Sequence, residues 1–160
     1  MQEFLPKVYC YVNEFNLSDL SKLSKNISII YRNYNDINYY EDVYKLKQFS
    51  KYSKNKIFLS NNIRLSIKLG LDGIYIPSFN NQINYTGSFS LPKSFKIIGS
   101  AHNLREIIIK QKQKCDEVFL SPLFKVDKSK KFLNVSKFNL IAINRKTSCI
   151  ALGGINQSNY

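Results

Sequence analysis

Short apolar segments recur along this chain and alternate with segments whose apolar residues have helical spacing. The apolar segments are rich in Val, Ile, Phe and Tyr, which is typical of β-strands. They predict strands over residues 8–12, 27–31, 56–59, 74–76, 97–98, 118–120 and 150–152. The segments between them predict helices over residues 17–23, 41–52, 63–69, 104–113 and 136–143. Because parallel strands need crossover connections of this length, the order predicts an α/β fold with parallel strands.

A closed TIM-type (β/α)8 barrel completes an alternation of this kind, and we expect it as a single domain over residues 1–160. The sequence stops at Tyr160, a few residues after the last predicted strand. We therefore expect an incomplete barrel with about seven parallel strands and no eighth β/α unit. Since unpaired strand edges favour association, we expect poor solubility, a homo-oligomer such as a dimer, or a partner segment that fills the gap.

Small and polar residues follow several of the predicted strands directly. Ser100 lies in the fifth strand, Ser121 follows the sixth, and Gly153 and Gly154 follow the seventh. Arg32 comes directly after the second strand. Ligands bind at the carboxyl ends of parallel strands in α/β proteins. These positions are therefore candidates for a binding site.

The composition is strongly basic, with 24 Lys and Arg against 11 Asp and Glu and a net charge of +13. Nucleic-acid binding is one interpretation of this charge. We disfavour it, because the lysines accompany abundant Asn, Ile and Tyr, as in AT-rich coding sequence, and cluster only over residues 125–131. That cluster is equally well interpreted as a solvated loop or as a phosphate-binding flap. Anionic small molecules such as phosphate esters suit the charge as well.

No segment is apolar for the roughly 20 residues that a membrane span needs. The first residues, 1–6, lack the basic and then apolar pattern of a signal peptide. The cysteines, Cys10, Cys115 and Cys149, are far apart and lie in or beside apolar segments. Free thiols of this kind are typical of a reducing compartment. We therefore expect a cytoplasmic protein with no membrane partner.

Five segments, in their order and spacing, resemble the thiamine phosphate synthase family, which includes the thiazole tautomerase TenI. They are Lys56–Asn61, Leu69–Ile76, Ser100–Glu106, Leu120–Phe124 and Ala151–Ile155. The resemblance implies a (β/α)8 barrel. It also implies a synthase that couples hydroxymethylpyrimidine pyrophosphate with thiazole phosphate, giving thiamine phosphate and pyrophosphate.

The same resemblance implies roles for individual residues. Arg32 matches the arginine that holds pyrophosphate, and Ser100 matches the serine of the fifth strand. Lys128 or Lys130 stands for the lysine of the loop after the sixth strand, with Lys130 as the catalytic candidate beside Arg32 and Ser100. The implied substrate-binding residues are Arg32, Ser60, Asn61, Ser100, Ser121, Lys128, Lys130, Gly153 and Gly154.

Three departures from the family pattern affect the expected chemistry. Tyr34 stands where the family has a second lysine. Asn61, and Asn80 or Asn81, stand where the family has magnesium carboxylates, so we expect Mg²⁺ binding to be severely weakened unless substrate phosphates do most of the binding. Pro122 replaces the catalytic histidine of the tautomerase branch, which places the chain nearer the synthases.

Two hypotheses follow from these departures. The chain is a synthase, or it is a catalytically impaired member that only binds phosphorylated thiamine precursors or thiamine phosphate. A basic nucleic-acid-binding module is the third and least favoured hypothesis. The single histidine, His102, could serve as a general base. We prefer a role in ordering the loop after the fifth strand through hydrogen bonds.

Overall fold

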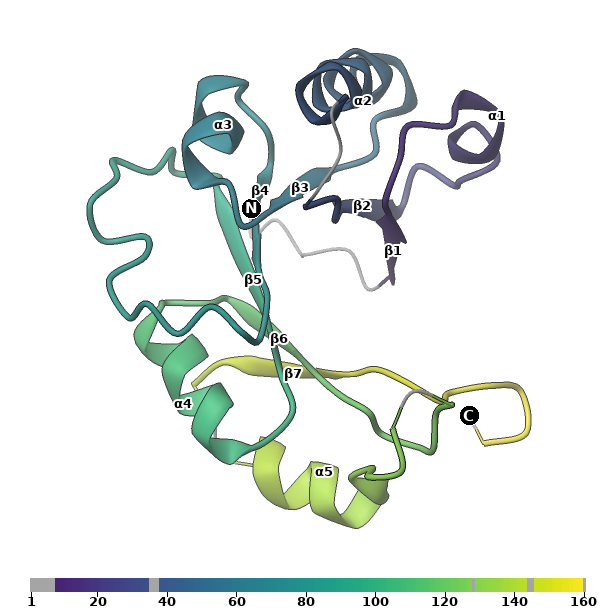
Figure 1. Ribbon diagram of the computed structural model, residues 1–160, viewed down its shortest axis with the longest axis vertical. Coiled ribbons are helices and arrows are strands. Elements are labelled where there is room, and N and C mark those ends of the chain that lie inside the picture. The colour runs from purple at the N-terminus through teal and green to yellow at the C-terminus, as the bar shows by residue number, and fades with distance from the viewer. Residues whose placement is uncertain (1–7, 35–37, 128, 144–145, 160) are drawn as a thin grey trace. The chain divides into compact units, whose positions relative to one another are not determined.

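The computed structural model describes residues 8–34, 38–127, 129–143 and 146–159 (Figure 1). Strands and helices alternate along these residues, as the sequence predicts. The strands are β1 (Val8–Val12), β2 (Ile27–Tyr31), β3 (Ile57–Ser60), β4 (Gly73–Ile76), β5 (Lys96–Ala101), β6 (Glu117–Leu120) and β7 (Ser148–Ala151). The helices are α1 (Leu17–Leu20), α2 (Tyr39–Ser53), α3 (Ile63–Lys68), α4 (Leu104–Lys112) and α5 (Asn134–Ala142).

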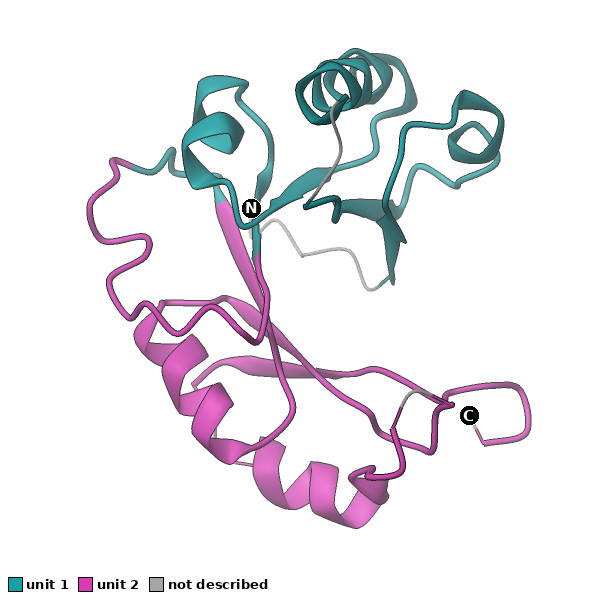
Figure 2. Ribbon diagram, viewed as in Figure 1, with its two compact units in different colours: residues 1–75, 91–95 teal, residues 76–90, 96–160 magenta. Residues whose placement is uncertain are grey.

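The chain forms two compact units, shown in different colours in Figure 2. The first comprises residues 1–75 and 91–95, and the second residues 76–90 and 96–160. In the first unit, strands β1 to β4 pair in parallel in chain order. In the second unit, β5, β6 and β7 also pair in parallel in chain order. The predicted α/β fold with seven parallel strands is therefore confirmed for the described residues.

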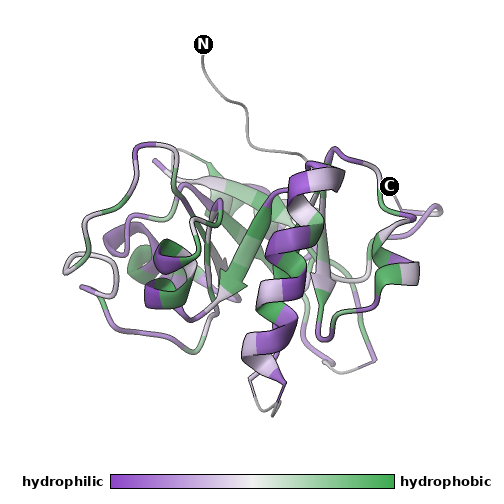
Figure 3. Cartoon of the chain, turned by 90° about the horizontal axis from the view of Figure 1, so that it is seen from above, coloured by the Kyte–Doolittle hydropathy of each residue, from purple (hydrophilic) through white to green (hydrophobic). Residues whose placement is uncertain are grey.

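The core of the first unit lies between its strands and its helices. Its buried side chains come from both layers: Leu20, Ile29, Tyr31, Val43, Leu46, Ile57, Leu59, Leu65 and Leu71. Figure 3 shows hydrophobic colouring along the strands and polar colouring over much of the helical surface. Burial of these side chains, at about 25 cal/mol per Å² of apolar surface, holds the helices on the strands. The apolar side chains of the strands are used in this core, and polar residues can occupy the carboxyl ends of the strands.

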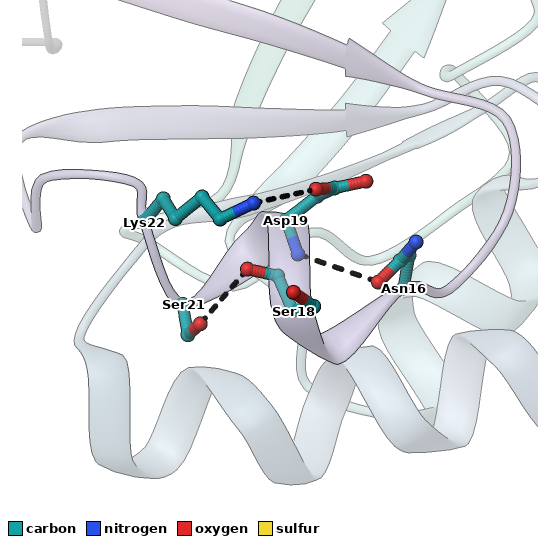
Figure 4. A network of polar contacts seen from close by, with 5 residues as sticks. All are labelled: Asn16, Ser18, Asp19, Ser21 and Lys22. Atoms are coloured by element: carbon teal, nitrogen blue, oxygen red, sulfur yellow. Dashed lines mark hydrogen bonds and ion pairs between the residues drawn. The ribbon is translucent and has the colours of Figure 1, made fainter.

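Asparagine side chains cap three of the helices at their first turn. Asn16, Asn62 and Asn103 each accept a hydrogen bond from the backbone N–H three residues further on, at 3.3, 3.2 and 3.0 Å. Such a side chain satisfies one of the N–H groups that a helix start leaves unpaired. In α1 an exposed ion pair adds to the cap, with Lys22 Nζ 3.1 Å from Asp19 Oδ1 (Figure 4).

Two aspartates each connect neighbouring strands at their amino ends through a pair of hydrogen bonds. Asp72, before β4, accepts a hydrogen bond from the N–H of Ile57 at 2.9 Å, and its own N–H donates to the carbonyl of Ile57. Asp116, before β6, makes the equivalent pair of bonds with Ile97, at 2.8 and 2.7 Å. Hydrogen bonds to a charged acceptor contribute about 1.5–3 kcal/mol each. The motif at Asp72 is therefore a structural device within the first unit.

Each helix of the described residues is either too short or too polar to cross a bilayer.

Candidate functional site

In the first unit, Arg32 lies at the carboxyl end of β2 and is held over an aromatic ring. Its backbone N–H donates to the carbonyl of Val12 at 2.7 Å, which continues the pairing of β1 with β2. Its guanidinium carbon lies 5.0 Å from the centre of the Tyr11 ring. Tyr11 in turn packs edge-on against Tyr75 of β4, with ring centres 5.6 Å apart. This cation–π contact restrains Arg32 while its charge stays at the surface.

Ser60 and Asn61, at the end of β3, lie beside a tyrosine hydroxyl rather than a lysine. The hydroxyl groups of Tyr34 and Ser60 are 2.8 Å apart. Burial raises the pKa of Tyr34 above its usual value, so the phenol is neutral at physiological pH. Asn61 adopts a left-handed conformation, with φ of 54°, and its N–H donates to the carbonyl of Tyr75. The predicted residues Arg32, Ser60 and Asn61 therefore all lie at strand ends of one unit.

In the second unit, His102 connects three segments at the end of β5. Its Nδ1 lies 2.9 Å from the carbonyl oxygen of Ser121, and its Nε2 lies 3.2 Å from Oγ of Ser78. Its backbone N–H donates to a carboxylate oxygen of Glu106 at 2.8 Å. Both ring nitrogens and the main chain are thus engaged. The preferred role of His102, ordering this loop through hydrogen bonds, agrees with these contacts.

A cavity of about 770 Å³ lies beside His102, at the carboxyl ends of β5, β6 and β7. Its polar lining includes His102, Ser121 and two lysines, Lys131 and Lys137. The rest of its lining is mainly apolar and comprises Pro122, Val126, Phe132, Leu133, Ile141 and Leu152. Such a combination of apolar walls with a few cations suits a small phosphorylated ring compound. We call this space the β5–β7 cavity.

Gly153, which also lines the β5–β7 cavity, and Gly154 are required by the backbone geometry after β7. Their φ angles are 92° and 72°, which disfavour any residue with a Cβ atom. A Cβ on Gly154 would lie 2.7 Å from the carbonyl oxygen of Lys125. Within the described residues, the N–H groups of the two glycines take part in no hydrogen bond. Both groups could therefore bind an anion, and the expected phosphate role of the pair stays a prediction.

Ser100 and Lys130, the other predicted site residues of the second unit, lie in different surroundings. Ser100 is buried in β5. A Cβ on the preceding residue, Gly99, would meet the side chain of Lys110 on α4, so alternation along the strand turns Ser100 away from α4. Lys130 is exposed and does not line the β5–β7 cavity. Lys128 lies outside the described residues.

Sequence reasoning missed the two cations that do line this cavity. Lys131 belongs to the basic cluster, but nothing in the sequence separates it from Lys130. Lys137 lies on α5, which begins two residues earlier than predicted. Tyr11 was also missed, although its place near the end of β1, next to the strand that precedes Arg32, was a usable signal.

Among the described residues, those at the positions expected to bind magnesium do not fit such a site. The oxygen donors at the two expected positions belong to neutral amides. The side-chain oxygen of Asn80 accepts from the N–H of Gln82 at 3.0 Å, so the amide serves a local turn. No group of three or more His, Cys, Asp and Glu side chains suited to a metal occurs in the part of the chain that the structure describes. Mg²⁺ prefers charged oxygen ligands.

Parallel strands with crossover helices, and polar groups at the strand ends, define the class of α/β proteins built on the TIM-type plan. The thiamine monophosphate synthase family matches the chain over residues 22–160. The chain belongs to this family, as its five sequence segments suggest. No curated protein matches the chain.

Solved structures support the same fold. The thiamine phosphate pyrophosphorylase from Pyrococcus furiosus superposes with a TM-score of 0.67 at 18% identity, over 96% of this chain and 79% of that one. A cube-shaped, highly porous protein cage, designed by fusing symmetric oligomeric domains, superposes with a TM-score of 0.64 at 11% identity. That match covers 97% of this chain and 57% of that one. At these identities the likeness shows the fold, and the association of copies of this chain stays a prediction.

Proposed function

We propose that this protein couples hydroxymethylpyrimidine pyrophosphate with thiazole phosphate to give thiamine phosphate and pyrophosphate. The observation that carries the proposal is the β5–β7 cavity. In it Ser121, Gly153 and two lysines line an apolar space at strand ends. Membership of the thiamine monophosphate synthase family supports the same reaction.

The β5–β7 cavity suits thiazole phosphate. Lys131 and Lys137 supply positive charge for the phosphate, and the N–H groups of Gly153 and Gly154 supply further donors. The apolar lining suits the thiazole ring. Because neither lysine is paired with a carboxylate in the described structure, their charge is available to a ligand.

Arg32 would serve the other substrate. When pyrophosphate leaves the pyrimidine, negative charge grows on the leaving group, and the pyrimidine carbon becomes electron-deficient until the thiazole nitrogen bonds to it. A fixed cation at the leaving group lowers the energy of that separation. The Tyr11 ring holds Arg32 in place, and its planar guanidinium can bind two phosphate oxygens at once.

The proposal is tested by ligand binding to the full chain and to Arg32→Ala. We expect Arg32→Ala to weaken pyrophosphate binding about 10- to 100-fold, since charge-assisted hydrogen bonds contribute about 1.5–3 kcal/mol. Thiazole phosphate should be affected less than about twofold. Arg64→Ala, which removes an exposed arginine of α3, is the matched control and should change neither affinity. Equal losses for both ligands in Arg32→Ala would contradict the role given to Arg32.

A protein that only binds these precursors is the second candidate. The observation that favours it is the amide chemistry at Asn61 and Asn80, where the side chain of Asn80 is committed to its own turn. A coupled assay with both substrates, with and without Mg²⁺, separates the candidates. Product formation at a rate above the uncatalysed reaction supports the synthase. Binding of both substrates without product supports the second candidate.

A further inference from the structure

Lys110 on α4 is a charged side chain in an unusual place. It is 0% exposed, although lysine is rarely fully buried without a charged partner. Its Nζ donates to the carbonyl of Pro77 at 2.7 Å, the carbonyl of Asn80 at 2.8 Å and the side-chain oxygen of Gln113 at 3.0 Å. These three neutral oxygens match the three donors of an ammonium group. Burial lowers the pKa of Lys110 to about 8, which still leaves it mostly charged at pH 7.

Gln113, one turn further along the chain, completes the attachment. It is also 0% exposed, and its Nε2 donates to the carbonyls of Asn80 and Gln82, each at 3.0 Å. The hydroxyl of Thr86 donates to the carbonyl of Gln113 at 3.2 Å. Together, Lys110 and Gln113 fasten the segment 77–86 to the end of α4. This segment has no helix or strand of its own, so these bonds replace the ladder that would otherwise order it.

The neighbouring strand provides room for the buried side chain. A Cβ on Gly99 of β5 would lie 2.9 Å from Cδ of Lys110 and 2.9 Å from Sγ of Cys115. Only glycine at this position allows the lysine stem to pass along β5. The buried ammonium is therefore part of the packing between α4 and β5 rather than a surface group folded inward.

The fastened segment is connected to the β5–β7 cavity through the contact of Ser78 with His102. Ser78 follows Pro77, whose carbonyl binds Lys110, and its Oγ lies 3.2 Å from Nε2 of His102. The other ring nitrogen of His102 contacts Ser121, and both residues line the cavity. A continuous chain of contacts thus runs from the buried ammonium to the cavity wall.

We propose that Lys110 is a positioning residue, whose buried ammonium fixes the segment 77–86 and thereby sets the orientation of His102 at the β5–β7 cavity. The consequence for ligand binding rests on the proposed function of that cavity. The effect on the segment and on His102 does not. A methionine at this position would fill similar space but could not hold the carbonyls of Pro77 and Asn80.

The single histidine makes a direct test available, because its ring signals in an NMR spectrum need no assignment. Lys110→Met is compared with Lys112→Met, which removes an exposed lysine from the same helix. We expect Lys110→Met to shift the ring signals of His102 and to speed amide hydrogen exchange in residues 78–86 about tenfold or more. Lys112→Met should do neither. Unchanged ring signals and unchanged exchange in Lys110→Met would overturn the proposal.

Two further measurements keep the test decisive. Where Lys110→Met does not fold, Lys110→Gln, which removes the charge and replaces three N–H donors by the two of an amide, is measured in the same way with the same criteria. Ser78→Ala should shift the His102 signals while leaving the exchange of residues 80–86 slow, because it cuts only the last contact. Binding of thiazole phosphate is measured separately. A wild-type chain that does not bind it contradicts the proposed function, while the histidine signals still decide the role of Lys110.

Discussion

Replacing Gly154 by alanine tests how tightly the end of β7 is fitted to the loop after β6. Two costs can be worked out from the structure. At a φ of 72°, a residue with a Cβ atom is destabilised by about 1–2 kcal/mol. The added Cβ would also lie 2.7 Å from the carbonyl oxygen of Lys125 and 2.8 Å from the carbonyl carbon of Phe124, so main chain must move. Overpacking of this kind costs about 1–3 kcal/mol.

We therefore expect Gly154→Ala to lower the free energy of unfolding by about 3 kcal/mol, measured by urea denaturation followed by circular dichroism. Gly70→Ala is the matched control for backbone strain. Gly70 has a φ of 58°, but the nearest atom to its added Cβ is the flexible Nζ of Lys47 at 4.0 Å. It should lose about 1–2 kcal/mol. Gly87→Ala, with no close contact and no left-handed backbone, should change stability by less than about 0.5 kcal/mol.

The difference between Gly154→Ala and Gly70→Ala isolates the close approach of the two backbones. Equal losses in these two variants would refute the reasoning, because they would mean that the loop after β6 moves away at no cost. Such a loop would also be unable to hold the shape of the β5–β7 cavity.

Two further predictions concern charged groups. Asp72→Ala should lower the free energy of unfolding by about 2 kcal/mol, because it removes a charge-assisted hydrogen bond from the N–H of Ile57. Asp127→Ala, at an exposed position, is the control and should have almost no effect. Equal urea midpoints for the two variants would contradict this prediction. The stability of the wild type relative to Lys110→Met should rise by about 1 kcal/mol from pH 7 to pH 9. The folded-state pKa of Lys110, about 8, lies below the ordinary lysine pKa of 10.5, so the unfolded chain binds more protons in this range and unfolding is disfavoured as pH rises. Glu106 and Cys115 are the charged or titratable neighbours that act on Lys110. If the stability difference between the wild type and Lys110→Met stays constant with pH, the lysine is not buried in solution.

The spacing of apolar residues predicted the helices and strands well, because the side chains that face the core determine that spacing. Strand β1 and strand β2 have the predicted bounds, and α4 begins at Leu104 as predicted. Helix α5 begins two residues earlier than predicted, at Asn134, which has a left-handed conformation with φ of 60° and whose side-chain oxygen accepts a hydrogen bond from the N–H of Lys137 at 2.9 Å.

The candidate site was harder to predict, because side-chain direction in loops depends on contacts between distant segments. Lys130 and Lys131 are equivalent in sequence, and only the path of the loop brings Lys131 to the cavity. Lysine is normally exposed, so no pattern marks Lys110 as buried. Its three oxygen partners come from Gln113, directly after the same helix, and from a segment about 30 residues earlier.

The aspartate ties at Asp72 and Asp116 lie at the amino ends of the strands, whereas Arg32, Ser121 and Gly153 follow the carboxyl ends. The groups that secure the framework are thus separated from those that we propose to bind ligands. Residues at the carboxyl ends can consequently be substituted, in evolution or by design, while the aspartates at the amino ends stay the same. A chain with this scaffold can thereby lose catalysis and keep ligand binding without losing its fold.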